Sequence, residues 1–336
     1  KDSAKTVKYA MKLTKGIQQS NLVVPNNKEI IFSESYIQKC VEKWSESFDY
    51  DFGGPNRTPK FPMPTSYQFL MRHAYKTKHK KLKDYVNITL SRMAYGGVFD
   101  QVGGGFARYS VDEKWHIPHF EKMLYDNGQL VSLYSDAFLI TKNELYKETV
   151  YNTLDFIERE LLHKDGGFYS SLDADSVNED NIMEEGAYYV WKKKDLQKII
   201  RSDYDLFSKY YNINDYGFWE HENYNLIRSK SDQQFVNMHK LDLADLKSRK
   251  DEWKIKLLAE REKRKPPRLD DKILTSWNAL MLKGYVDAYR VFDDNHFLRI
   301  AIKNASFIED NLIKEDGSLF RSYKNKESTI NAYIED

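Results

Sequence analysis

The 336-residue sequence has little cysteine, no long apolar run and almost no net charge. With Cys40 alone, the chain can form neither an intrachain disulfide nor a thiolate metal site. No run of 18 apolar residues occurs, so we expect no membrane-spanning helix and no membrane partner. The first residues also lack the apolar core of a signal peptide. These features favour a reducing, cytoplasmic location, but organelle targeting stays open because the true N-terminus need not be visible.

The charge balance argues against a polyanionic partner. The chain has 52 Lys and Arg against 51 Asp and Glu, which leaves a net charge of +1. Such a chain has no global field that attracts nucleic acid or an anionic membrane surface. The basic run KRKPPR at 263–268 is short and lies beside a predicted helix end. We therefore expect no nucleic-acid partner.

Apolar residues recur at helical spacing along most of the chain. The spacing predicts helices at 37–48, 64–79, 119–140, 145–162, 240–264, 275–292 and 297–313. Pro64 would take a first helical position, Cys40 would lie in the core, and Thr275 would cap the helix that follows it. Residues 275–292 are apolar on several sides, which predicts burial all round. Strand-like alternation is confined to short pieces near 168–171 and 187–191.

A glycine-aromatic turn returns between the predicted helices. It reads DYDFGGP at 49–55, GGGFARY at 103–109, DGGFYSS at 165–171, DYGFWEH at 215–221 and DGSLFRS at 316–322. The intervals between the first four turns are about 50 to 60 residues, the length of two helices and their connections, and the last interval is about twice that. Stacked hairpins with apolar inner helices and charged outer ones predict an all-α fold, an (α/α) toroid. The region 192–268 fits this period least well and is interpreted as a surface excursion.

The most polar stretch is GGVFDQVGGGFARYSVDEKWHIPHFEKMLYDN, residues 96–127. In the helix predicted from residue 119, His119 and Asp126 share a face about 10 Å apart, so both could face one cavity. Histidine can act as an acid, a base or a donor to a sugar hydroxyl. The alternative is that His116 and His119 only satisfy backbone groups at a helix start.

Metal and cofactor sites are not expected in this stretch. His116, His119 and Glu121 do not have the spacing of a helical zinc pair, and Pro118 interrupts them. The glycines lack the GK[ST] ending of a phosphate loop. They are better explained by a close approach of the backbone to a ligand or to another segment. We expect no metal and no cofactor.

Two further acidic segments are candidates for chemistry. SLDADSVNEDNIMEEGAYYVW at 171–191 places Asp173 and Asp175 after a turn, and RLDDKILTSWNALM at 268–281 contains Asp271 and Trp277. Paired carboxylates perform glycosidic chemistry, and tryptophan stacks on sugar rings. The alternatives are a solvated acidic loop, a helix-start aspartate and a buried tryptophan. A calcium loop is disfavoured because Val177 stands where a third oxygen ligand is needed.

Together these motifs resemble the YyaL-like, spermatogenesis-associated protein 20 family. The resemblance is carried by residues 96–127, TPKFP at 58–62, DADS at 173–176, EEGAYYVW at 184–191 and DDKILTSWNALM at 270–281. It implies a thioredoxin-like domain followed by an (α/α)6 toroid related to six-hairpin glycosidases and N-acylglucosamine 2-epimerases. On this basis a thioredoxin-like module in cis would precede residue 1, residues 1–32 would be a linker, and residues 33–336 would be a toroid incomplete at its C-terminus.

The resemblance also implies a small sugar or glycan ligand and a carbohydrate-active enzyme, either a glycoside hydrolase or a sugar 2-epimerase or isomerase. The candidate catalytic residues are His116, His119, Asp126, Asp173 and Asp175. The candidate substrate-binding residues are Arg108, Tyr109, Asp112, Asp271 and Trp277. The alternative is a non-catalytic toroid that binds a glycan or a protein in a redox or regulatory protein.

Overall fold

The computed structural model describes residues 3–20, 22 and 33–336. The chain divides into two compact units, residues 1–47 and 48–336. The first unit holds α1 (Ser3–Ser20) and α2 (Glu34–Ser45), and Ser33 caps α2 by accepting a hydrogen bond from the Tyr36 backbone. Cys40 is exposed on α2, so its predicted core position was wrong. The predicted domain boundary at 32/33 adjoins residues 23–32, which lie outside the described residues, and stays a prediction.

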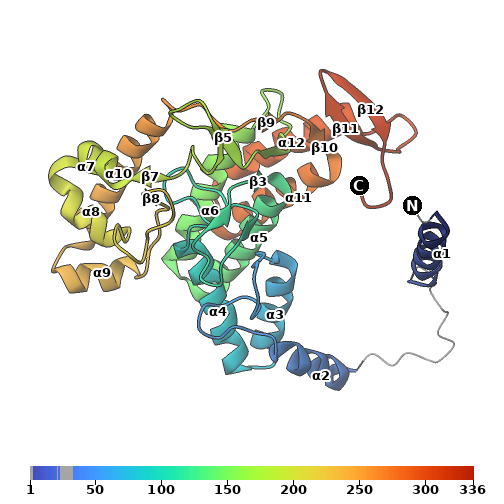
Figure 1. Cartoon of the computed structure of the whole chain (residues 1–336), viewed down its shortest axis with the longest axis horizontal. Helices are drawn as coiled ribbons and strands as arrows, with labels where there is room; N and C mark the ends of the chain where they lie inside the picture. The colour runs from blue at the N-terminus through green and yellow to red at the C-terminus, as the bar shows by residue number, and fades with distance from the viewer. Residues whose placement is uncertain (1–2, 21, 23–32) are drawn as a thin grey trace. The chain divides into compact units, whose positions relative to one another are not determined.

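Six helices of the second unit pair into three hairpins in two layers (Figure 1). The hairpins are α3 (Pro64–Lys76) with α4 (Lys80–Tyr95), α5 (Leu124–Thr141) with α6 (Glu144–Phe156), and α11 (Thr275–Phe292) with α12 (Asn295–Leu312). A π-helical turn, Ile157–Leu161, continues α6. Helix α5 packs on both α3 and α11, and α4 packs on α6, so the first helix of each hairpin lies in an inner layer. The fold class is confirmed as an all-α arrangement of helical hairpins of the (α/α) toroid type.

Helix α5 is the most deeply buried helix of the inner layer. Residues on nearly all of its sides are buried, and Gly128 allows α11 to approach closely. A Cβ added at Gly128 would lie 2.9 Å from the Met281 Cα, and one at Gly284 would lie 2.8 Å from the Gly128 carbonyl oxygen. The prediction of all-round burial for residues 275–292 was wrong, because Val286 on α11 is 45% exposed.

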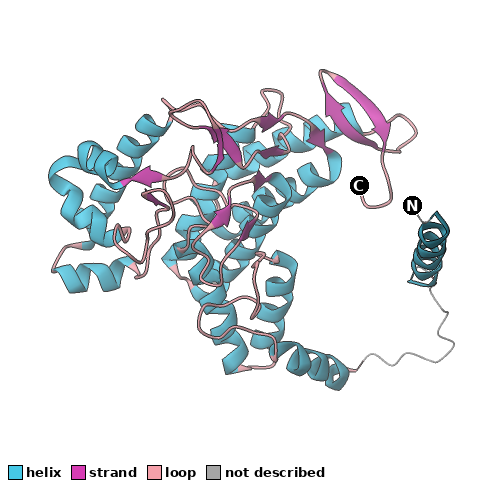
Figure 2. Ribbon diagram, viewed as in Figure 1, coloured by secondary structure: helices cyan, strands magenta, loops and turns pink. Residues whose placement is uncertain are grey.

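The strands are short pieces in the loops, and all of them pair antiparallel (Figure 2). The pairs are β1 (Tyr109–Ser110) with β2 (Pro118–His119), β5 (Asp175–Val177) with β6 (Met183–Glu185), and β7 (Trp191–Lys192) with β8 (Asn223–Tyr224). The three-stranded sheets are β3 (Lys122–Met123), β4 (Ser171–Leu172) and β9 (Leu269–Asp270), and β10 (Ile273–Leu274), β11 (Phe320–Lys324) and β12 (Glu327–Asn331). The helix predicted from residue 119 begins only at Leu124. The backbone of the two preceding residues, Lys122 and Met123, pairs with β4 instead of forming helical hydrogen bonds. Thr275 is the first residue of α11, not its cap.

The segment predicted as a surface excursion contains a second hydrophobic core. It holds α7 (Lys193–Ile200), a 3-10 turn (Arg201–Asp203), α8 (Tyr204–Tyr210), α9 (Asp232–His239) and α10 (Leu243–Arg261). Trp191, Phe207 and Trp253 are fully buried members of this core. Figure 1 shows these helices, yellow to orange, grouped on one side of the hairpins.

Each of the five predicted glycine-aromatic turns lies within or beside an isolated antiparallel bridge. The bridges join Phe48 to Pro55, Phe99 to Phe106, Leu162 to Phe168, Phe218 to Tyr224 and Ile313 to Leu319. In four of the five the bridge encloses the glycines of the turn, which is the structural counterpart of the sequence repeat, whereas Gly217 lies outside the bridge of Phe218 and Tyr224.

Two of these turns share a buried Asp–Lys module. In the first, Asp49 accepts hydrogen bonds from the backbone of Phe52 and pairs with Lys60 at 2.5 Å, and Lys60 also donates to the Gly53 carbonyl. In the second, Asp100 plays the same part with Lys122 at 2.8 Å. A buried lysine needs such partners, because an unpaired charge in the interior is costly.

Asparagines at the starts of two inner helices fasten the preceding turns. The Asn127 side chain in α5 accepts from the Phe106 N–H at 2.7 Å and donates to the Phe106 carbonyl at 3.1 Å. The Asn278 side chain in α11 makes the same pair of bonds with Phe168, at 2.8 and 3.0 Å. Each asparagine is the fifth residue counted from the helix cap, so the turn and the inner helix form one repeated unit.

Replacing Asn278 with alanine should destabilise the protein, because the buried Phe168 N–H and carbonyl would lose their partner. We expect a loss of about 2–4 kcal/mol in the free energy of unfolding, since each unsatisfied buried group costs about 1–3 kcal/mol. Urea denaturation followed by circular dichroism measures it. Asn237→Ala, at an exposed position of α9, is the control and should change stability by less than about 0.5 kcal/mol. Equal stability of the two variants would contradict the repeated unit.

Candidate functional site

Polar side chains gather where β1, β2 and α5 meet. Arg108 precedes β1, and its backbone N–H donates to the Glu121 carbonyl at 2.8 Å. The antiparallel register places Tyr109 opposite His119, and their rings stack with centroids 4.9 Å apart. Local strand pairing therefore aligns residues on either side of the loop at 111–117. We call Arg108, His119, Glu121, Tyr125, Asp126 and Glu185 the acid–arginine cluster.

Charged contacts connect one side of this cluster in a chain. The Arg108 guanidinium pairs with Glu121 at 3.0 Å, and the same carboxylate oxygen lies 3.8 Å from His119 Nε2. On its other nitrogen, His119 Nδ1 lies 2.7 Å from the carboxylate of Glu185 in β6. A carboxylate on one ring nitrogen fixes the orientation of the imidazole. His119 is thus held between two carboxylates, those of Glu121 and Glu185.

Asp126 is the most perturbed acid of the cluster. It lies in the first turn of α5, is 9% exposed, and its Oδ2 has no hydrogen-bond partner among the described residues. Burial raises the pKa of Asp126 to about 7, against the opposing effects of the Arg108 charge and a hydrogen bond from Tyr125. A carboxyl group with a pKa near neutrality can both give and take a proton at working pH.

Two aromatic rings stand beside the acid. Tyr125 hydrogen-bonds to Arg108 and meets the half-buried Trp277 edge-on, with ring centroids 4.8 Å apart. Burial raises the pKa of Tyr125, so it keeps its proton as a donor. Trp277 comes from the first turn of α11, so the two inner helices that approach at Gly128 also bring their first turns to one place.

A cavity of about 630 Å³ adjoins the cluster through Glu121. Its lining residues are Glu121, Ser171, Asp173, Arg268, Leu269, Asp270, Asp271, Lys272 and Lys324. Lys324 donates to Asp271 at 2.6 Å and thereby lowers the pKa of that carboxyl, and Arg268 lies 3.9 Å from Asp173. Two of the three aspartates predicted from the acidic segments, Asp173 and Asp271, therefore share one cavity, and each has a cation close by.

Three of the predicted site residues lie elsewhere. Asp112 accepts hydrogen bonds from the backbone N–H groups of Lys114 and Ile117, so it shapes the loop. The His116 ring stacks on Tyr216, and burial lowers its pKa. Asp175 is exposed in β5, opposite Glu185. The structure thus gathers Arg108, Tyr109, His119, Asp126 and Trp277 at the cluster. Asp112 and His116 lie outside it, and Asp175 lies at its edge as the strand partner of Glu185.

Sequence reasoning did not select Glu121, Tyr125 or Glu185 for the site. Glu121 was considered only as a zinc ligand, although it lies in the same motif as His119. Its position could have indicated this, because residues 119 and 121 are two apart and therefore point to the same side of an extended segment. Glu185 arrives from 66 residues away, and no local pattern shows that.

Metal and membrane features can be tested directly in the described part of the chain. There, no three His, Cys, Asp or Glu side chains are grouped closely enough to hold a metal ion. Among the same residues, no helix is both long and apolar enough to cross a bilayer.

Comparison with known proteins identifies relatives. No family model matches the chain. An uncharacterized protein of Caenorhabditis elegans is 36% identical over 321 residues, covering 88% of this chain and 43% of that protein. Human spermatogenesis-associated protein 20 is 33% identical over 311 residues, covering 84% of this chain and 39% of that protein. The chain thus spans about two-fifths of these relatives, and the predicted family resemblance is confirmed.

The solved structures similar to this chain include carbohydrate enzymes at low similarity. A sugar epimerase from a ruminal bacterium is 14% identical, with 88% of this chain and 91% of that chain covered and a TM-score of 0.38. The cellobiose 2-epimerase of Bacillus thermoamylovorans is 13% identical, with 88% and 93% covered and a TM-score of 0.36. A heparin-specific unsaturated glucuronyl hydrolase is 11% identical, with 76% and 46% covered and a TM-score of 0.40. The architecture of this chain is therefore described from its own helices and their packing.

The raised pKa of Asp126 predicts a pH-dependent stability. Between the ordinary value of 3.8 and about 7, the unfolded chain is ionised while folded Asp126 keeps its proton. Stability is therefore fully present below that window and falls as pH rises through it, by about 4 kcal/mol for a shift of about three pKa units. Asp126→Asn removes this loss, so the variant should become more stable relative to the wild type as pH rises from 4 to 8. Urea denaturation at several pH values measures the difference; a constant difference would contradict the assigned pKa.

Proposed function

We propose, for this relative of spermatogenesis-associated protein 20, that the acid–arginine cluster transfers protons in a carbohydrate-active enzyme, a glycoside hydrolase. The observation that carries the proposal is Asp126, a buried carboxyl with a pKa near 7 and an unpartnered Oδ2. Glycosidic chemistry needs two acidic groups in opposite protonation states. Asp126 supplies the protonated group, and Glu121, paired with Arg108, supplies the ionised one.

The roles of the two acids follow from their surroundings. The Asp126 carboxyl gives its proton to the glycosidic oxygen, so that the bond from that oxygen to the anomeric carbon breaks as the leaving alcohol forms. The Glu121 carboxylate takes a proton from water, and the hydroxide so formed bonds to the anomeric carbon. Trp277 and Tyr125 offer rings beside the acid, and the cavity of about 630 Å³ next to Glu121 has the volume for a sugar unit.

His119 supports a different carbohydrate reaction from the same cluster. Held by Glu185 on Nδ1, its Nε2 can remove a proton beside a carbonyl carbon, as a 2-epimerase requires. Arg108 would then stabilise the enolate oxygen. Hydrolysis is favoured over this reaction because it uses the buried protonated carboxyl, for which epimerisation has no evident need.

One observation favours a second candidate function, a non-catalytic toroid that binds a glycan or a protein. The two aspartates of the cavity, Asp173 and Asp271, have Arg268 and Lys324 beside them. Alternating acids and cations along one cavity offer hydrogen-bond donors and acceptors to a bound glycan or protein without requiring a reaction.

Product analysis tests the proposal. The chain is incubated with disaccharides, N-acyl sugars and reducing sugars, and products are separated by chromatography. We expect cleavage of a glycosidic bond that falls at least about 100-fold in Asp126→Asn, the usual range for losing a general acid. The rate should also decrease as pH rises through about 7, because the acid must carry its proton.

Asp215→Asn, at an exposed position of a loop, is the matched control and should keep wild-type turnover. Turnover that survives Asp126→Asn would refute the role of that acid. Conversion of one reducing sugar into another, lost in His119→Asn, would assign the epimerase reaction. No turnover from folded protein would leave glycan or protein binding as the function.

A further inference from the structure

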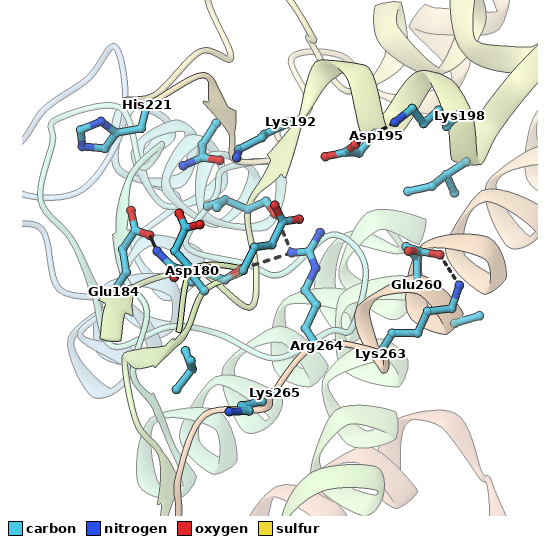
Figure 3. A pocket seen from close by; sticks show the side chains of 18 of the residues that line it. Asp180, Glu184, Lys192, Asp195, Lys198, His221, Glu260, Lys263, Arg264 and Lys265 are labelled. Carbon is cyan, nitrogen blue, oxygen red and sulfur yellow. Dashed lines mark hydrogen bonds and ion pairs between the residues drawn. The ribbon is translucent and has the colours of Figure 1, made fainter. Parts of the chain in front are cut away.

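A second and larger cleft, of about 1180 Å³, lies between the β5–β6 hairpin, α7 and the end of α10 (Figure 3). We call it the α10 cleft. Its charged and histidine lining residues are Glu179, Asp180, Glu184, Lys192, Asp195, Lys198, Arg201, His221, Lys256, Glu260, Lys263, Arg264 and Lys265. Its lining contains no Phe, Tyr or Trp, so a ligand here would be recognised through charge and hydrogen bonds, not through ring stacking.

Arg264 occupies the middle of the α10 cleft (Figure 3). Its Nη1 donates to the backbone carbonyls of Ala187, Tyr188 and Val190, at 3.2, 3.1 and 2.7 Å. Its guanidinium also lies over the Trp191 ring at 4.1 Å. Three carbonyls and a ring face fix the guanidinium in place, and its other nitrogens make no hydrogen bond within the described chain.

The positive charge of Arg264 has no counterion. In the part of the chain that the structure describes, no carboxylate lies within 4.0 Å of its guanidinium, in contrast to Arg261, which pairs with Asp100 at 2.6 Å. Burial and the neighbouring charge of Arg261 lower the pKa of Arg264 to about 10. Glu179, Asp195 and Glu260 act in the opposite direction from beyond that distance, so the guanidinium stays charged at neutral pH with no carboxylate in direct contact.

The other cations of the cleft are also in excess. Seven Lys and Arg line it against five Asp and Glu. Three of these cations form ion pairs, Lys263 with Glu260 at 2.6 Å, Lys198 with Asp195 at 3.9 Å and Lys256 with Glu252 at 2.6 Å. Within the described residues, four cations and three acids of the lining therefore form no ion pair. Within the described residues, Lys192 forms no ion pair with a carboxylate, and Figure 3 shows it on the wall beyond Arg264.

Two wall residues hold left-handed backbone conformations that disfavour side chains. Arg201 has φ 60° and His221 has φ 52°. Such conformations cost about 1–3 kcal/mol each and cluster at ligand sites, where the surrounding structure keeps them.

We propose that the α10 cleft binds a small phosphate-bearing anion, seated on Arg264 and contacted by Lys192. A guanidinium with free N–H groups presents the planar fork that phosphate oxygens accept. The volume of about 1180 Å³ exceeds that of a bare ion, so the phosphate belongs to a larger organic molecule. The site is separate from the acid–arginine cluster and does not depend on the proposed hydrolysis.

Isothermal titration calorimetry of the chain with inorganic pyrophosphate at low ionic strength tests this site. We expect saturable binding that weakens at least tenfold in Arg264→Gln and several-fold in Lys192→Gln. Arg57→Gln, an exposed arginine outside the cleft, is the matched control and should bind as the wild type does. Citrate is titrated in parallel, because it offers carboxylates in place of phosphates.

Absence of pyrophosphate binding by the wild type, or wild-type affinity in both cleft variants, would overturn the proposal. Tighter binding of citrate than of pyrophosphate would overturn the assignment to phosphate. Circular dichroism checks each variant for folding. If Arg264→Gln does not fold, Lys192→Gln decides the question, because Lys192 forms no ion pair in the described structure and its removal leaves the carbonyl contacts of Arg264 intact.

Discussion

The buried carboxylate of Asp100 holds together three segments that are far apart in sequence. It pairs with Lys122 at 2.8 Å and with both terminal nitrogens of Arg261, at 2.6 and 3.0 Å. These two cations hold the pKa of Asp100 well below its usual range. Removing one partner would leave a buried charge uncompensated, which typically costs about 3–5 kcal/mol. Because Lys122 directly follows Glu121 and precedes α5, the triad also fixes where the acid–arginine cluster lies.

The glycine-aromatic turns and most helices could be predicted from the sequence, because both depend on local patterns. The turns need positive φ at residues such as Gly104, and inner helices such as α5 need apolar spacing. The start of α5 could not be predicted this way. Pro118 suits a first helical turn, yet a hairpin pair with Ser110 and a long-range pair between Lys122 and Leu172 engage the backbone before Leu124.

The candidate site was predictable only where its residues are close in sequence. Arg108, His119 and Asp126 come from one motif, so selecting that motif selected them together. Glu185 comes from β6, and it reaches His119 only because the β5–β6 hairpin folds back on the cluster. Hydrophobic periodicity gives no information about a contact between residues 66 positions apart. The charge run at 263–268 shows the same limit. Its charges predict a solvated segment, but Arg264 within it is half-buried against Trp191.

The two Asp–Lys modules differ in how much chain must be ordered before they close. The pair of Asp49 and Lys60 spans 11 residues, and that of Asp100 and Lys122 spans 22. Arg261 joins Asp100 across 161 residues, so closing this contact costs more chain entropy, and Arg261 ends the helix α10 that contributes Trp253 to the second hydrophobic core. The completed triad therefore links the folding of the excursion to that of the hairpins, and the excursion is not a removable insert.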